Sequence, residues 1–407
     1  MNHIRTGVAP AIACMNVRYS PNLGDGLLAE CLEVALRDHG AAPATRSIDL
    51  AGRTHYGQQI SGRGAVMSVL EALPGALRQT AIRLPLAIQA RRKWGPHYAT
   101  GLQGMQAVAI GGGNLISDFD LNFPTKLQLA MEHAHRRHLP AAIYACGMGA
   151  SWSAEGLRRM RRGFACDSLR AVFLRDEASK DLWNRLMGPA TGHQAAVVRD
   201  PGLLASQVWP HAAGPGARIG VGIMSHIAIR YHGKASIDAG ALERWYLELI
   251  AALVAAGREV VVFTNGSPED VTLLERLRSA LPQGAIIDNP QTPEQLARLI
   301  AGCAGIVAYR MHAVIAAYSY GIPALALAWD AKLASFMASV DRSDWLRDPA
   351  TLPAAEAARL ILAGADDGID EPTFARVLSQ ARADVGRLLA VLRTDAPTEL
   401  GALGDKA

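Results

Sequence analysis

The sequence is poor in cysteine, and the few cysteines form no recognisable pair. The 407 residues include five cysteines, none in a C-x-x-C arrangement, and their neighbours are mostly apolar. An odd number of scattered cysteines in such surroundings argues against a disulfide framework and indicates reduced, mostly buried thiols in a cytosolic protein. Nothing beside Cys14 or Cys303, which lie near expected loops, marks an activated nucleophile.

Aromatic residues make up only 6% of the chain, and no aromatic stacking pattern accompanies its basic runs RRKW (91–94), HAHRRH (133–138) and RRMRR (158–162). We therefore expect no nucleic-acid partner. The runs are explained either as solvated helix faces or as an attraction to an anionic membrane surface or substrate. The histidines of HAHRRH have no carboxylate to complete a ligand set, so we expect a solvated helix face and no metal site.

Long apolar runs are missing as well. No stretch reaches the roughly 18 uninterrupted apolar residues that a membrane span needs. The apolar part of the start, MNHIRTGVAPAIACMNV, is too short and wrongly flanked for a signal peptide. Only 19% of the residues are charged and 50% are hydrophobic, which is typical of a globular chain. We expect a cytoplasmic protein.

Short strand-like runs alternate with amphipathic helical ones in the first half of the chain. A run of 407 residues exceeds what one hydrophobic core normally serves, so two domains are expected. Apolar runs bounded by glycine or charge, with helices between them, indicate a parallel sheet that is covered on both faces. The expected strands are VAPAIACMNV (8–17), AVAIGG (107–112), AAIYACG (141–147), AVFLRD (171–176) and AAVVRD (195–200).

A second alternating set follows VWPHAAGPGAR (208–218), whose prolines and glycines indicate a linker. We therefore predict an α/β fold with two doubly wound, Rossmann-like domains that face a cleft, as in the GT-B type. The N-terminal domain would span 1–207 and the C-terminal domain 219–393, with a frayed tail at 394–407. In such sheets ligands bind beyond the carboxyl ends of the strands.

Two glycine-containing loops follow expected strands in the first domain. In SPNLGDGLLAE (20–30), Asn22, Gly24 and Asp25 precede a helix, whose N–H groups can hold an anion or a sugar hydroxyl; capping by Asp25 is the structural alternative. In AIGGGNLISD (109–118), Gly112 and Gly113 would let a ligand approach the backbone, and Asn114 adds an amide. A packing turn explains the second loop equally well. It is neither a Walker loop nor a G-x-G-x-x-G fingerprint.

Two arginines stand directly after expected strands. Arg175 in FLRDEAS could bind a carboxylate or phosphate at the carboxyl edge of the sheet, or form a structural ion pair with Asp176 or Glu177. Arg199 in VVRDPGLLA precedes a proline turn, which explains Asp200 well, so a structural role is favoured there.

The strongest candidate site is YRMHAV, where a buried strand ending at Tyr309 runs into a helix. Arg310 and His312 fall in this turn, over the carboxyl edge of the second sheet and beside a helix N-terminus. Arg310 can bind an anion, and a histidine side chain is suited to proton transfer near neutrality. A lone histidine held by backbone groups is the alternative, but the pair at this edge favours a functional site.

These motifs, in this order, resemble the polysaccharide pyruvyl transferase family from about residue 16 to residue 340. The specific part is YRMHAVIAAYSYGIPALALAWDAKLASF, with its R-x-H, G-I-P and D-x-K elements. The resemblance implies a GT-B-like fold and transfer of the pyruvyl group of phosphoenolpyruvate to a sugar, as a cyclic ketal. The product would be a cell-surface exopolysaccharide or a lipid-linked precursor of the cell envelope. No cofactor is expected.

The resemblance also assigns roles. Arg310 would hold the donor's phosphate or carboxylate, His312 would transfer a proton, and Arg175 would be a second anion clamp. Lys332 matches the lysine of the D-x-K element, and Asp25 the aspartate of the N-x-G-D turn on the acceptor side.

One stretch departs from the family pattern. Ser225 and His226 stand where an arginine or asparagine is expected after a strand. We keep both as substrate-binding candidates and leave the acceptor, and the donor, open. A glycosyltransferase that uses a nucleotide sugar and a noncatalytic sugar-binding protein are the alternative functions. With a lipid-linked acceptor, the basic runs would hold the protein at the inner face of the membrane.

Overall fold

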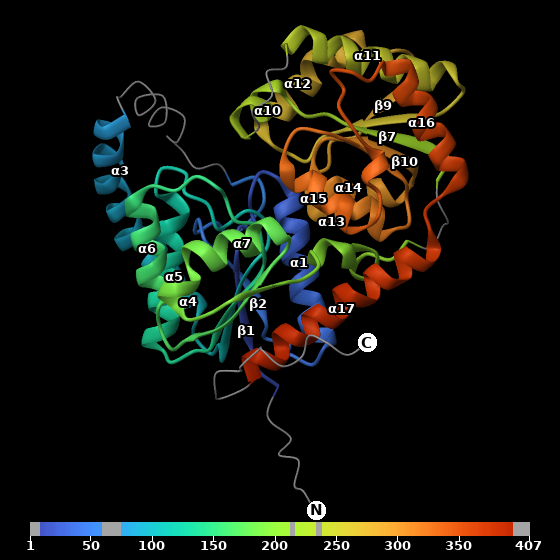
Figure 1. The fold of residues 1–407 in the computed structure, drawn as a ribbon. Helices are drawn as coiled ribbons and strands as arrows, with labels where there is room; N and C mark the ends of the chain where they lie inside the picture. Colours follow the sequence, from blue (N-terminus) through green and yellow to red (C-terminus); the bar gives the residue numbers. More distant parts are fainter. Residues whose placement is uncertain (1–8, 59–74, 212–215, 233–237, 394–407) are drawn as a thin grey trace, which may run out of the picture. The chain divides into compact units, whose positions relative to one another are not determined.

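The computed structural model describes residues 9–58, 75–211, 216–232 and 238–393, and it divides into two compact units (Figure 1). Unit 1 consists of Met1–Arg18, Leu32–Asp200 and Ala383–Ala407, and unit 2 of Tyr19–Cys31 and Pro201–Arg382. Each unit contains one parallel six-stranded sheet.

The sheet of unit 1 has the strand order β2-β1-β3-β4-β5-β6, and all neighbouring strands are parallel. Every residue of the three strands β1, β3 and β4 is buried, because parallel strands between two helix layers expose neither face. The strands are β1 (Ile12–Asn16), β2 (Arg46–Asp49), β3 (Ala107–Gly111), β4 (Ala141–Cys146), β5 (Leu169–Leu174) and β6 (Ala195–Val197).

Helices accompany the strands of unit 1. Their apolar sides pack with the sheet into one core, to which Tyr98, Met131 and Trp183 contribute. The helices are α1 (Leu23–Asp38, of which residues 32–38 belong to unit 1), α3 (Gly75–Gln89), the π-helical turn η1 (Ala90–Trp94), α4 (Gly95–Gly101), α5 (Asn122–Arg136), α6 (Ala154–Phe164), α7 (Glu177–Leu186) and α8 (Gly188–Thr191).

The sheet of unit 2 has the order β12-β11-β10-β7-β8-β9, again entirely parallel. Its core includes Tyr246, Val262 and Tyr309. The strands are β7 (Arg218–Gly222), β8 (Val260–Phe263), β9 (Ala285–Ile287), β10 (Cys303–Ala308), β11 (Ala324–Leu327) and β12 (Leu346–Arg347).

The helices of unit 2 again separate successive strands along the chain. They are η2 (Pro201–Leu204), α9 (Ala205–Val208), α10 (His226–His232), α11 (Ala239–Ala255), α12 (Pro268–Leu277), η3 (Arg278–Ala280), α13 (Pro293–Ala301), α14 (Met311–Ser319), α15 (Ala331–Ser339), η4 (Ser343–Trp345), α16 (Ala354–Asp367) and α17 (Glu371–Arg393).

The strand orders locate the switch point of each sheet. In unit 1 the first strand, β1, lies between β2 and β3, and in unit 2 the first strand, β7, lies between β8 and β10. The chain reverses its direction of winding there, which opens a crevice beyond the carboxyl ends of the strands where doubly wound folds bind ligands. Ligand sites are therefore expected beyond the carboxyl ends of β1 and β3 in unit 1, and of β7 and β10 in unit 2.

Near both ends of the chain, the division into units differs from the predicted domain boundaries. Residues 19–31 go with unit 2, because the Leu23 amide donates to the Asn265 carbonyl at 2.7 Å. The end of α17 goes with unit 1, because the Asp384 carboxylate accepts the Arg199 amide at 2.8 Å. These long-range contacts leave no pattern in the local sequence.

The boundary between the units in the middle of the chain falls at 200/201, ahead of the predicted linker 208–218. Ala205, just before that linker, and Trp209, within it, are both bound by unit 2, because the Tyr320 hydroxyl donates to their carbonyls. Part of the linker, 212–215, and the predicted frayed tail, 394–407, lie outside the described residues.

The cysteines agree with the prediction of buried, unreactive thiols. Cys14, Cys31, Cys146 and Cys303 are buried, and Cys166 is half-buried. Burial raises the pKa of Cys14, and it raises the pKa of Cys303 to about 12. Both side chains therefore remain thiols near neutral pH, which argues against a nucleophilic role.

Candidate functional site

Arg310 and His312 lie at the point where β10 ends and α14 begins. All six residues of β10 are buried, and Arg310 is the N-cap residue of α14, which places His312 in the first turn of the helix. His312 is only 7% exposed. Because the strand is apolar up to its end, the arginine and histidine follow it at the carboxyl edge of the sheet, as predicted, and this edge is also the switch point of the sheet.

The His312 ring lies against the start of α1. Its Nδ1 is 3.9 Å from Oδ1 of Asp25, and a Cβ atom at Gly24 would lie only 2.5 Å from the Cβ and Nδ1 of His312. Asn22 shapes this turn, because its side-chain oxygen accepts the Gly24 amide at 3.2 Å and its carbonyl accepts the Asp25 amide. Gly24 and Asp25, in the first turn of α1, thus lie beside the predicted histidine, and Asn22 shapes the turn that precedes them.

Two helix N-termini, those of α1 and α14, meet at this place. Each N-terminus carries the positive end of a helix dipole, and at α1 the amides of Leu23, Gly24 and Asp25 already donate to Asn265 and Asn22. The arrangement favours an anionic ligand beside a side chain that can carry a proton.

Arg310 is held by a carboxylate that the sequence did not indicate. Its Nε and Nη2 donate to Oδ2 of Asp270 at 2.8 and 2.6 Å, and Nη2 is also 3.4 Å from Glu269. Asp270 is fully buried, near the start of α12, whereas the Arg310 side chain is 13% exposed. Within the described part of the chain, Nη1 has no partner, so one edge of a fixed guanidinium is left for a ligand.

Asp270 also connects the pair to the loop after β7. Its Oδ1 accepts the Ser225 amide at 2.8 Å, and the Ser225 hydroxyl accepts the Ile227 amide at 3.3 Å. Burial raises the pKa of Asp270, and the Arg310 charge opposes this rise. Ser225 therefore shapes the turn that presents the half-buried His226, and ligand binding by these two residues stays a prediction.

Lys332 lies in the first turn of α15, beyond the end of β11. Its Nζ is 3.9 Å from Oδ2 of Asp330, the residue that caps this helix by accepting the Leu333 amide. The nearby Trp329 donates from its indole to the Tyr309 carbonyl at 2.8 Å, which ties this loop to the end of β10.

The predicted residues of unit 1 form a second group. Gly112 and Gly113 follow β3 with φ values of 89° and 68°, a backbone conformation that favours glycine. The Gly113 carbonyl accepts the Gly147 amide at 2.8 Å. A Cβ atom at Gly147 would lie 2.6 Å from Nη2 of Arg175 and 3.0 Å from Oδ1 of Asn114, so both side chains converge on this glycine.

The local backbone explains this convergence. The pairing of β4 with β5 is irregular between Ile143 and Cys146, and Ala145 has a φ of 51°. A bulge of this kind redirects the end of a strand, here toward Gly147 and the residue after β5, Arg175. Sequence reasoning missed Gly147, whose only signal was its place as the last residue of an expected strand.

Arg175 is a buried cation with little compensation. Its side chain is 6% exposed, and the closest carboxylate, that of Asp176, is 3.6 Å from Nε without a hydrogen bond. Asp176 instead caps α7 by accepting the Ser179 amide at 2.7 Å. The alternative of a structural ion pair therefore accounts poorly for Arg175. Since burying a charge without strong partners is costly, the site suits an anion that arrives as a ligand.

We expect replacement of Arg175 by Met to leave the fold as stable as before or more stable, by up to about 4 kcal/mol, because an apolar side chain of similar length removes a poorly compensated charge. Urea unfolding of the two proteins would measure this difference. A Met variant that is less stable by several kcal/mol would instead identify Arg175 as a structural residue.

Asn265 is a further polar residue that the sequence analysis missed. It follows β8, is 1% exposed, and its Nδ2 has no hydrogen-bond partner in the described part of the chain. Its carbonyl holds the start of α1 through the Leu23 amide. The signal in the sequence was the polar run TNGSPED (264–270), which follows the apolar run VVVF and contains both Asn265 and Asp270.

The histidines of the run HAHRRH (133–138) agree only in part with the predicted solvated helix face. His133 is buried beside the Tyr98 ring, with a centroid distance of 6.1 Å, and burial lowers its pKa to about 4. His135 and His138 are exposed, as predicted. No group of three or more His, Cys, Asp or Glu side chains suited to a metal ion occurs among the described residues.

Comparison with known proteins gives a family and a fold. Residues 22–331 match the model of the polysaccharide pyruvyl transferase family. No curated protein sequence matches the chain. The solved structures to which the chain is similar include a UDP-GlcNAc 2-epimerase from Neisseria meningitidis, bound to UDP-GlcNAc, with a TM-score of 0.51 and 13% identity over 94% of this chain and 99% of that one.

A UDP-GlcNAc 2-epimerase from Methanocaldococcus jannaschii gives a TM-score of 0.52 and 10% identity, over 93% of this chain and 99% of that chain. The UDP-N-acetylglucosamine 2-epimerase from Rickettsia bellii gives a TM-score of 0.50 and 10% identity, over 95% of this chain and 96% of that chain. Likeness at such identities concerns the fold, and it confirms the predicted GT-B class of two doubly wound α/β units.

Proposed function

The chain belongs to the polysaccharide pyruvyl transferase family, and we propose that it moves the pyruvyl group of phosphoenolpyruvate onto hydroxyls of a sugar in a cell-surface polysaccharide or its lipid-linked precursor. The observation that carries the proposal is the position of His312, which is buried against the N-terminus of α1. It lies two residues after Arg310, whose guanidinium is held in place by Asp270. A proton donor and an anion-binding group are what this chemistry requires.

The reaction adds two hydroxyls to one carbon of the donor. His312 gives a proton to the methylene carbon of the enol, and a sugar hydroxyl attacks the neighbouring carbon and loses its own proton. Phosphate leaves from the tetrahedral adduct with the electrons of its carbon–oxygen bond. A second hydroxyl adds, loses its proton and closes the ketal. The donor's own phosphate is the leaving group, so the proposed reaction uses no cofactor.

The donor carries a carboxylate and a phosphate, and positive groups fixed in advance stabilise the charge that develops on the departing phosphate. We assign this role to Nη1 of Arg310 and to the N-terminus of α14. Arg175 of unit 1 keeps its predicted role as a further anion-binding residue. Asp25, 20% exposed and beside His312, is assigned to the acceptor hydroxyl.

Gly24 gives a test of the close approach to His312. In a Gly24→Ala variant we expect the His312 ring to be displaced and turnover to fall on the order of 100-fold, because a shift of about 1 Å in a reacting group has such an effect. Initial rates of phosphate release from phosphoenolpyruvate would measure the loss. Gly57, whose Cβ position is open, provides the control Gly57→Asn, since Asn tolerates its φ of 76°. A Gly24→Ala enzyme with the wild-type rate would contradict the assignment of His312.

The donor itself is tested by a thermal-shift scan with phosphoenolpyruvate and a panel of nucleotide sugars. A ligand that binds only the folded state raises the melting temperature. We expect a shift with phosphoenolpyruvate, and phosphate release when a suitable sugar acceptor is added. A shift with a nucleotide sugar alone would favour glycosyl transfer, in keeping with the UDP-GlcNAc bound by one protein of similar fold. Binding without phosphate release from any acceptor would favour a noncatalytic sugar-binding protein.

The cellular place of the reaction belongs to the same proposal. Among the helices that the structure describes, none is long and apolar enough to cross a bilayer. We propose that the protein acts in the cytoplasm, where phosphoenolpyruvate is available, with a saccharide acceptor that is polymeric or lipid-linked.

A further inference from the structure

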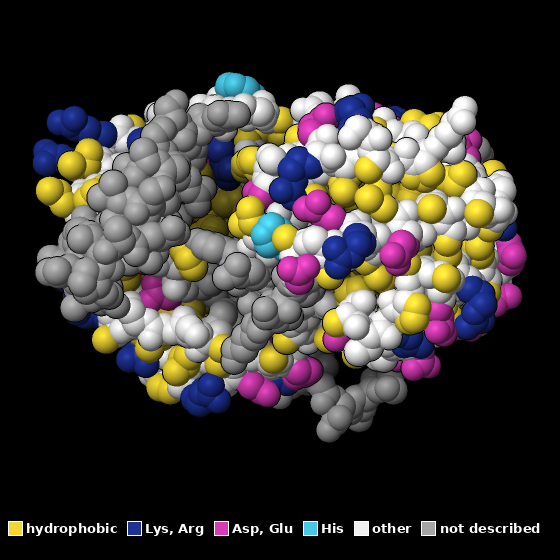
Figure 2. All heavy atoms as spheres, turned by 90° about the horizontal axis from the view of Figure 1, so that it is seen from above, with side chains coloured by type: hydrophobic (Ala, Val, Ile, Leu, Met, Phe, Trp, Pro, Cys, Tyr) yellow, Lys and Arg dark blue, Asp and Glu magenta, His cyan; other side chains and the backbone are white. Residues whose placement is uncertain are grey.

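One surface of unit 1 combines exposed apolar side chains with arginines. It is formed by α3, η1 and α6, and we call it the α3–α6 surface, consisting of Leu84, Ile88, Arg91, Arg158 and Arg162. Leu84 is 69% exposed and Ile88 46% exposed. At the left of Figure 2, hydrophobic and basic side chains lie together. Helix α3 lies at the same side in Figure 1.

Helix α3 has two apolar sides. Ile82 and Leu86 are buried in the core of unit 1. Leu84 and Ile88, with Arg91 a turn further on, are spaced as neighbours on a different side of the helix, which is exposed. A second apolar side that the fold leaves uncovered requires another explanation than the core.

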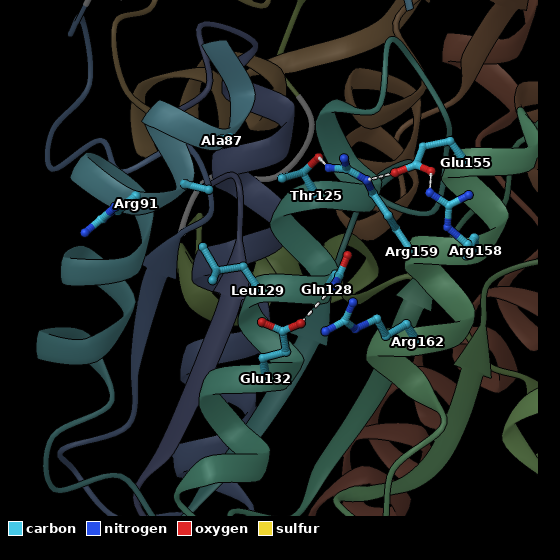
Figure 3. A pocket seen from close by; sticks show the side chains of 11 residues that line it. Ala87, Arg91, Thr125, Gln128, Leu129, Glu132, Glu155, Arg158, Arg159 and Arg162 are labelled. Carbon is cyan, nitrogen blue, oxygen red and sulfur yellow. Dashed lines mark hydrogen bonds and ion pairs between the residues drawn. The ribbon is translucent and has the colours of Figure 1, made fainter. Parts of the chain in front are cut away.

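A pocket of about 450 Å³ opens beside this side of α3 (Figure 3). Its wall on α3, η1 and α5 is partly apolar, with Ala87, Ala90 and Leu129, and its wall on α6 carries arginines. Figure 3 shows Arg158 and Arg159 directed at Glu155, and Arg162 beside Gln128 and Glu132. An apolar wall facing a cationic one matches an amphiphile with an anionic head.

The carboxylates of the pocket are already engaged. Arg159 bonds Glu155 through Nε at 2.6 Å and holds the pKa of that carboxyl below its usual range, and Arg158 pairs with the same group. Glu132 accepts from Gln128 at 2.8 Å. Among the described residues, neither Arg91 nor Arg162 has a hydrogen-bond or ion-pair partner, so the surface keeps a positive excess.

We propose that the α3–α6 surface binds an anionic phospholipid bilayer, with Leu84 and Ile88 between the lipid headgroups and Arg91, Arg158 and Arg162 on their phosphates. Basic side chains next to exposed apolar ones on a helix are what interfacial binding to anionic lipid uses. The proposal does not depend on pyruvyl transfer. It specifies how the chain would reach an acceptor at the membrane, and its test needs no enzymatic activity.

Flotation of the full chain with vesicles tests the proposal. Vesicles of phosphatidylcholine alone and of phosphatidylcholine with phosphatidylglycerol would be compared at low and high salt. We expect binding to the anionic vesicles only, and weaker binding at high salt because salt screens exposed charges. Equal binding to neutral vesicles, or none to either kind, overturns the proposal.

Variants locate the binding surface. Arg91→Ala with Arg162→Ala should weaken binding on the order of 30-fold, at about fivefold for each basic residue near an anionic surface. Leu84→Ser with Ile88→Ser should weaken it about tenfold or more. The matched controls lie in unit 2 at exposed positions, Arg276→Ala with Arg278→Ala and Ile286→Ser, and should bind like wild type.

All these side chains are exposed, so the melting temperatures should match that of the wild type, which separates lost binding from lost folding. Unchanged vesicle binding in both α3–α6 variants would overturn the proposal. So would a self-association in solution that the Leu84→Ser, Ile88→Ser variant abolishes, since the surface would then be an interface between two copies of the chain.

Discussion

Replacing His312 by Ala should lower the rate of pyruvyl transfer by about 10²- to 10⁴-fold while the affinity for phosphoenolpyruvate changes little. A positioned general acid contributes a factor of this size, because the donor carbon is a poor base and must be protonated as the hydroxyl attacks. The His312 ring lies 3.9 Å from Asp25 and is kept close to α1 by the absence of a side chain at Gly24. Anion binding is assigned to other groups, so it should survive.

Turnover and affinity have to be measured separately for this prediction. Single-turnover phosphate release reports the chemical step, and the phosphoenolpyruvate dependence of the melting temperature reports binding. His312→Gln fills the space that Ala leaves empty but has no group that can transfer a proton near neutral pH, so it should be as inactive as the Ala variant. His211→Ala, an exposed histidine of unit 2, is the control. Parallel losses of turnover and affinity would make His312 a binding residue.

The central strands were predictable from the sequence because a fully buried strand needs an uninterrupted run of apolar or small residues. Runs such as AVAIGG and AAIYACG correspond to β3 and β4, in which every residue is buried, and parallel strands between helix layers have to be apolar throughout. The strand β2 was missed. Its sequence is RSID and it starts exposed, because an edge strand meets water and needs no apolar run.

The positions of Arg310 and His312 were predictable for a related reason. A polar pair directly after a fully apolar strand falls at the carboxyl edge of a parallel sheet, whatever the strand order. Their partners were not predictable from local patterns. Asp270 meets Arg310, and Gly24 meets His312, only because β8, β7 and β10 are adjacent and because α1 starts beside Asn265.

The salt bridge between Arg310 and Asp270 leads to the largest expected effect on stability. Arg310→Met should lower the free energy of unfolding by about 3–5 kcal/mol, because Asp270 is fully buried and loses both donors of its Oδ2. A simple Arg310 variant would therefore lose donor binding for two reasons, the missing cation and the weakened fold. Urea unfolding at neutral pH measures the second.

The loss should depend on pH in a defined direction. Burial already raises the pKa of Asp270 against the opposing Arg310 charge, so removing the arginine raises it further. An acid whose folded pKa exceeds its unfolded value of about 3.9 makes the fold more stable as pH falls through the folded pKa. The deficit of Arg310→Met should thus be full at neutral pH and shrink in acid. A deficit that is independent of pH would mean that the carboxylate finds another partner.

The double variant Arg310→Met with Asp270→Leu separates the two contributions. Removing both charges of a buried pair is often neutral or stabilising, so most of the lost stability should return. The amide of Ser225 then loses its acceptor, which leaves a residual cost of about 1–3 kcal/mol. If Arg310 holds the donor, the refolded double variant still shows no thermal shift with phosphoenolpyruvate. Recovery of that shift together with stability would mean that Arg310 supports the fold alone and that the donor is held elsewhere.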